Sequence, residues 1–167
     1  MLMNLEQLYD EKKSLPLGHV RRKEIDRIID KEYQACRDLE KKLFKNLPKY
    51  LQKKGGVLSP KKVRSFYKYA STNLKLRPVT VKIGGCSRGS GGTYSASGTQ
   101  GTKPRTISFP SYCKKKVATK TALHEFSHHV TAEERMWEGG SHGSSFLWAL
   151  EMVFETFEAW WKDTQET

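Results

Sequence analysis

Residues 124–128 read His-Glu-Phe-Ser-His, which is the pattern H-E-x-x-H. On a helix, residues four apart lie on the same face, one turn above the other. His124 and His128 can therefore offer two imidazole nitrogens to one cation, and zinc suits neutral imidazole. Glu125 lies about 100° further round the helix, from where its carboxylate can reach a water bound to that cation. The spacing predicts one Zn²⁺, with Glu125 as the general base.

A catalytic zinc site needs a third protein ligand, and His142 is the candidate. Residues 139–146 read Gly-Gly-Ser-His-Gly-Ser-Ser-Phe. The glycines allow the chain to turn back after the first helix. His142 would then stand at the entrance of the next helix and face His124 and His128.

The two motifs together resemble the SprT-like (Spartan-type) zinc metallopeptidases. The pattern of that family is H-E-x-x-H, a short variable span, and then H-G-x-x-F/W opening a helix. His142, Gly143 and Phe146 match the second half. The likeness covers about residues 60–160 in layout, and motif identity covers only these few positions. It implies hydrolysis of peptide bonds in a protein or peptide substrate, in a minimal form that lacks the family's frequent cysteine zinc ribbon.

Other zinc peptidase patterns are tested by the residues after the motif. Metzincins need a glycine and a third histidine where this chain has Thr131 and Glu134. Gluzincins use a glutamate on a later helix, and Glu151 or Glu155 could serve, so this alternative stays open. His129 points about 100° away from its predecessor and is expected to pack rather than to ligate the same ion.

The first third of the chain is predicted to be helical. A short helix is expected over residues 4–13, and a long amphipathic helix over 17–47, ended by Pro48. Its apolar stripe is Ile25, Ile28, Ile29, Tyr33, Cys36, Leu39, Leu43 and Leu47. The stripe could pack on its own domain or form a coiled coil with a partner. We expect an N-terminal helical extension over 1–56 and a zincin-like metallopeptidase domain over 57–167.

The rest of the chain predicts an α+β fold that places the motif helix beside a small sheet. A helix should begin at Ser59 as N-cap and Pro60 as its first residue. Strands are expected at 79–83, 93–97 and 105–109, with a plain glycine-rich loop at 84–92. The motif helix should span 115–131, and an aromatic C-terminal helix should span about 144–162 with its stripe in the core. In a SprT-like layout the last strand would be the edge that pairs with an extended substrate.

Composition bears on location. The chain is 37% apolar, and no run approaches the roughly 20 apolar residues of a membrane-spanning helix. The N-terminus lacks the basic start and apolar core of a signal peptide. The three cysteines are far apart and form no C-x-x-C, which argues against a disulfide framework and a cysteine zinc site. A cytoplasmic, membrane-free protein is expected.

Charge is unevenly distributed along the chain. Residues 71–123 contain ten Lys or Arg and no Asp or Glu, whereas residues 124–167 contain two basic and nine acidic residues. Such asymmetry favours an acidic partner, and we expect region 61–120 to contact DNA. Spartan-type proteases act on proteins attached to DNA, which agrees with this expectation. The alternative is an ordinary solvated basic face.

Two other functions fit the residues less well. One is a nucleic-acid-binding module with a structural metal, but such a site has no use for Glu125 and is usually closed by four protein ligands. The other is a metal-dependent hydrolase of a non-peptide amide. The residue that stabilises the oxyanion is unassigned, with Tyr94, Tyr112 and Arg105 as candidates.

Overall fold

The structure is a computed structural model of the 167-residue chain, and it describes residues 5–49, 51, 56–84, 92–95, 105–133 and 143–165. Its helices are α1 (Leu5–Ser14), α2 (Val20–Lys45), α4 (Pro60–Asn73), α5 (Thr119–Glu133) and α6 (Ser144–Gln165), with a 3₁₀ turn η1 (Ser111–Lys114). Its strands are β1 (Val57–Leu58), β2 (Val79–Ile83), β3 (Thr93–Ser95), β4 (Arg105–Phe109) and β5 (Val117–Ala118). The predicted α+β composition is confirmed.

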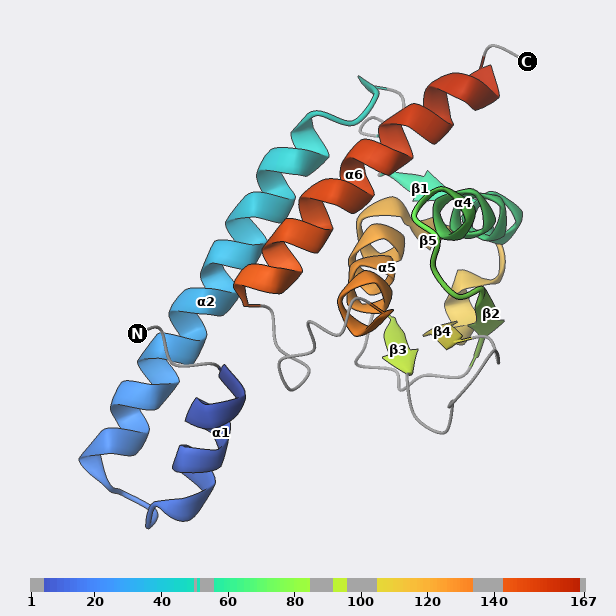
Figure 1. Cartoon of the computed structure of the whole chain (residues 1–167). Helices are drawn as coiled ribbons and strands as arrows, with labels where there is room; N and C mark the ends of the chain where they lie inside the picture. Colours follow the sequence, from blue (N-terminus) through green and yellow to red (C-terminus); the bar gives the residue numbers. More distant parts are fainter. Residues whose placement is uncertain are drawn as a thin grey trace.

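Helix α5, which carries the H-E-x-x-H motif, occupies the centre of the fold (Figure 1). It contacts α6 on one side and strands β3 and β4 on the other. Helix α2 runs alongside α6 in the same direction, as Figure 1 shows. The motif helix is therefore held between a helical layer and the sheet.

The three-stranded sheet has the order β2-β4-β3. Strands β2 and β4 are parallel, with Val79 opposite Arg105, and β3 is antiparallel to β4, with Thr93 opposite Ser108. The prediction that 105–109 is the edge strand was wrong, because β4 pairs on both of its sides. The short strand β3 is the edge on the α5 side.

The segment before the motif helix also differs from the prediction. We expected helix from residue 115, but Val117 and Ala118 form strand β5, which pairs antiparallel with β1. Because the backbone of these two residues pairs with β1, they are not available for the first turn of a helix, and α5 begins only at Thr119. The predicted start of α4 is confirmed: Ser59 is the N-cap and accepts a hydrogen bond from the Lys62 amide, and proline follows it.

One hydrophobic core joins most of these elements. The aromatic rings of α4, α5 and α6 meet in it: Phe66 lies 5.8 Å from Phe126 and 5.2 Å from Phe157 between ring centroids. The predicted stripe of α6 is buried as expected. Cys36 and Leu47 of the α2 segment belong to the same core. The long N-terminal helix thus packs on the protein's own core through its C-terminal half.

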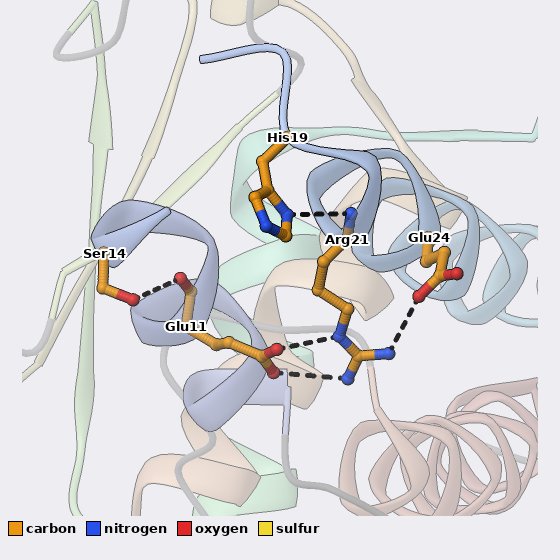
Figure 2. Close-up of polar contacts among 5 residues, drawn as sticks. All are labelled: Glu11, Ser14, His19, Arg21 and Glu24. Atoms are coloured by element: carbon orange, nitrogen blue, oxygen red, sulfur yellow. Dashed lines mark hydrogen bonds and ion pairs between the residues drawn. The ribbon is translucent and has the colours of Figure 1, made fainter. Parts of the chain in front are cut away.

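The N-terminal half of α2 instead forms a hairpin with α1 around a small separate cluster of Leu8, Ile25 and Ile29. Figure 2 shows the polar contacts that tie the hairpin together. Arg21 donates to both carboxylate oxygens of Glu11, at 2.8 and 3.3 Å, and the imidazole of His19 accepts from the Arg21 amide. The guanidinium beside Glu11 holds the pKa of that carboxyl below its ordinary value.

Across the described residues, no helix combines the length and the apolar character needed to cross a membrane.

Candidate metal and catalytic site

His124 and His128 lie one turn apart on the side of α5 that meets the start of α6. Their ring centroids are 5.0 Å apart. The ring of Phe146 lies beside both, with centroids 4.9 Å from His124 and 4.6 Å from His128. Both imidazoles are half-buried. Two neutral imidazoles on one helix face form a donor pair that suits zinc, and the aromatic ring beside them limits the access of water.

Glu125 lies on the sheet side of α5 and is 7% exposed. Its side chain packs against the backbone at Gly92, immediately before β3: a Cβ atom placed on Gly92 would lie 3.3 Å from Oε1 of Glu125. Tyr67 of α4 packs on the same helix, where its ring stacks on Phe126 with centroids 5.0 Å apart. Burial, and then the charge of Glu125, raises the pKa of Tyr67 well above its ordinary value. The tyrosine hydroxyl donates to the carbonyl of Ala122 at 2.7 Å.

A carboxylate from the other end of the chain contacts the first motif histidine. Glu40 of α2 is 5% exposed, and its Oε1 is hydrogen-bonded to Nδ1 of His124. Its second oxygen lies 4.0 Å from the ammonium of Lys120. A buried carboxylate is costly unless it is paired and hydrogen-bonded, and both partners of Glu40 come from α5.

Cys36, one turn before Glu40 on α2, completes a group of three side chains that could hold a metal ion. The potential ligand atoms of Cys36, Glu40 and His124 all lie within 4.8 Å of one another. Burial, followed by the negative charge of Glu40, raises the pKa of the Cys36 thiol to about 12. Without a metal the sulfur therefore stays protonated at neutral pH, and binding of a metal there would release that proton.

His129 is fully buried, and its Nε2 lies 2.8 Å from the carbonyl oxygen of Arg77. Burial lowers its pKa below the ordinary value. Its expected packing role is confirmed.

At the end of α5, Glu133 accepts a hydrogen bond from Nε of Arg105 at 2.9 Å and lies 3.6 Å from Nε of Arg77. These two arginines tie α5 to β4 and to the segment before β2.

The proposed third ligand, His142, lies outside the described residues, as does Glu134. The alternative ligands Glu151 and Glu155 are exposed on α6. They lie about 140° and 180° round that helix from Phe146, which faces the histidine pair. The gluzincin alternative therefore places its carboxylates away from the site.

The three candidates for oxyanion stabilisation are dispersed. The Arg105 guanidinium is engaged with Glu133. Tyr112 is 70% exposed in η1. Tyr94 lies in β3, and its side chain is outside the described part of the structure.

Two contributors to the site were not recognised in the sequence: Glu40 and Gly92. Glu40 carried a readable signal, because it stands four residues after Cys36 and three before Leu43, inside the apolar stripe of α2. A carboxylate at an inward position of an amphipathic helix requires a buried partner. The residues near Glu40 in the sequence do not indicate which residue this partner is.

Comparisons with known proteins found no protein-family model, no curated protein and no solved structure that matches this chain. Function must therefore be inferred from the residues and their geometry.

Proposed function

We propose that the protein is a zinc-dependent metallopeptidase of SprT-like type. The observation that carries the proposal is the pair His124 and His128, side by side on one face of α5 with ring centroids 5.0 Å apart and with the ring of Phe146 against them. Phe146 belongs to the H-G-x-x-F motif and follows His128 by 18 positions. Its contact with both imidazoles supports the proposal that the second motif belongs to the same site.

The donor set fits zinc. His124 and His128 supply two imidazoles, and His142 is the proposed third ligand. When bound, zinc lowers the pKa of a coordinated water to about 7 and polarises a carbonyl as a Lewis acid. Cys36 is not part of this set, because the two motifs already supply three histidines; its sulfur belongs instead to the group with Glu40 and His124.

Glu125 is the proposed general base. It accepts a proton as the water oxygen attacks the scissile carbonyl carbon. It then returns that proton to the amine nitrogen as the carbon–nitrogen bond breaks. Its burial against Gly92 and near Tyr67 restricts the positions that the carboxylate can adopt, which is the preorganisation that proton transfer requires.

The substrate is proposed to bind as an extended strand along β3. Among the described strands β3 pairs only with β4, so its other edge can accept a further strand. Since Gly92, immediately before β3, lies against Glu125, a peptide paired along β3 would pass close to the proposed base.

DNA is proposed as a second partner, through part of the basic region 61–120. Arg77 and Arg105 of this region are engaged with Glu133 inside the fold. The lysines at 114–116, in and after η1, are exposed, as are Lys75 and Lys82. These exposed lysines, rather than Arg77 and Arg105, are the proposed phosphate contacts.

A second candidate function is a binding module with a structural metal at Cys36, Glu40 and His124. The specific observation in its favour is that this group joins α2 to α5 with two buried members. In that case the metal would stabilise the fold and no turnover would follow.

The deciding experiment is Glu125→Gln, with zinc content and cleavage of an unstructured protein such as casein measured on the same preparation, with and without duplex DNA. The variant should keep its zinc and lose cleavage by about 10²–10⁴-fold, the usual contribution of a general base. Glu155→Gln makes the same chemical change on an exposed face of α6 and should cleave normally. Unchanged cleavage in zinc-loaded Glu125→Gln protein would overturn the mechanism.

A further inference from the structure

Glu40 lies on a helix that the H-E-x-x-H motif does not include, yet it is bonded directly to the first motif histidine. Its side chain is 6% exposed, against 22% for His124. An isolated buried carboxylate is unfavourable, and apolar side chains often replace buried charges without loss of stability. Stability alone therefore gives little reason for a glutamate at this inward position of α2.

The chemistry of the two groups assigns a direction to this bond. An ionised carboxylate only accepts hydrogen bonds, so opposite an ionised Glu40 the donor is the Nδ1–H of His124. A neutral imidazole with its proton on Nδ1 keeps a lone pair on Nε2. Metal-binding histidines commonly donate their other ring N–H to a carboxylate, which fixes both the tautomer and the plane of the ring.

Direct contact between Glu40 and His124 also argues against shared ligation. Two ligands of one ion hold the ion between them, whereas these two atoms meet each other as donor and acceptor. The arrangement fits an orienting carboxylate better than a three-ligand site.

We propose that Glu40 is a positioning residue for the metal centre: it holds His124 in the Nδ1–H tautomer and aims Nε2 at the ion. The inference rests on the proposed zinc site and extends it to α2. The N-terminal helix would then be part of the site rather than only a covering layer. Lys120, at 4.0 Å from the second oxygen and 44% exposed, is a minor partner of the same carboxylate.

The test measures zinc affinity by competition with a chelator in the full chain, for wild type, Glu40→Leu, Glu40→Gln and Cys36→Ser. Removal of an outer partner of a metal ligand typically costs about 10–100-fold in affinity. Glu40→Leu should show such a decrease, while its thermal midpoint stays equal to that of wild type or rises. Glu40→Gln keeps an acceptor oxygen at the same reach and should recover part of the affinity. Cys36→Ser should bind zinc as wild type does.

A spectroscopic readout in the metal-free protein separates positioning from general destabilisation. Nitrogen-15 spectra of the imidazoles, assigned with a His124→Gln variant, should show His124 protonated on Nδ1 in wild type. In Glu40→Leu that preference should disappear. Wild-type zinc affinity in Glu40→Leu would overturn the proposal, as would an equal decrease in Cys36→Ser, which would make the group itself the metal site.

The outcomes also distinguish this inference from the proposed peptidase. Zinc binding that depends on Glu40, in a protein that cleaves nothing, would remove the peptidase and leave the positioning role. Cleavage that depends on Glu125, with zinc binding indifferent to Glu40, would do the reverse. A wild-type protein that binds no zinc would overturn both.

Discussion

The backbone of Gly92 lies directly against the side chain of Glu125. A Cβ atom on Gly92 would lie 2.9 Å from Cγ of Glu125 and 3.2 Å from Cγ2 of Thr121. Since Glu125 is almost fully buried, it has little room to move away. This contact couples the residue immediately before the edge strand β3 to the proposed general base.

Gly92→Ala should therefore lower the rate of cleavage while zinc binding is retained. The new methyl group would displace the carboxylate, and a displacement of about 1 Å at a catalytic group can cost on the order of 10²-fold in rate. Steady-state kinetics and zinc content on one preparation provide the measurement. Adding Thr121→Ala relieves the clash with Thr121 but leaves the one with Glu125, so it should not restore the rate. A fully active Gly92→Ala protein would contradict the packing described.

The third ligand can be tested by zinc content. His142→Ala should release most of its zinc at equal folding, because two imidazoles alone do not complete a zinc site. His19→Ala removes a histidine at the exposed start of α2 and should bind zinc normally. Full zinc content in His142→Ala, together with a decrease in Glu151→Gln, would move the third ligand to α6.

The α1–α2 hairpin makes a prediction about pH. The pKa of Glu11 is lowered chiefly by its hydrogen bonds to Arg21. A carboxyl whose pKa is lower in the folded state stabilises the fold above its unfolded pKa, and this contribution disappears as pH falls through the folded pKa. Arg21→Gln should raise the pKa of Glu11 toward its ordinary value of 4.5. The hairpin's stability should then change less with pH below about 5.

The measurement is a carbon-13 NMR titration of the Glu11 carboxyl, with Arg22→Gln as the control. Arg22 donates to the carbonyls of Lys12 and Leu15 and to no carboxylate that the structure records for it. Its replacement should leave the pKa of Glu11 low. An unchanged Glu11 pKa in Arg21→Gln would show that the pair does not persist in solution.

The exposed lysines at 114–116 make a prediction about DNA. If they bind phosphates, replacing all three with glutamine should reduce the slope of log affinity against log salt by about 0.9 per phosphate that they neutralise on duplex DNA. Fluorescence anisotropy over a range of salt concentrations measures it. A control with Lys31, Lys41 and Lys42 replaced removes equal charge from exposed positions of α2, outside the basic region. Equal slopes in both variants would indicate a general effect of net charge.

Local chemistry made several parts of this protein predictable. Ser59 and Pro60 specify the start of α4. The serine side chain accepts a hydrogen bond from an amide of the first turn, and proline has no backbone N–H that would require a partner there. The β-branched run of β2 and the aromatic stripe of α6 specify strand and buried helix by their periods. The spacing of His124 and His128 specifies a shared helix face. Each of these depends only on residues within a turn or two.

Only the tertiary structure shows which distant segments these elements and side chains pair with. Val117 and Ala118 became strand because β1, some 60 positions earlier, offers them hydrogen bonds. Strand β4 became central because β2 and β3 both pair with it, which no local pattern reveals. Glu40 reached His124 across 84 positions only because α2 packs on the core beside α5 and α6. Side-chain periodicity states which face is buried, whereas the partner of that face depends on the packing of the whole chain.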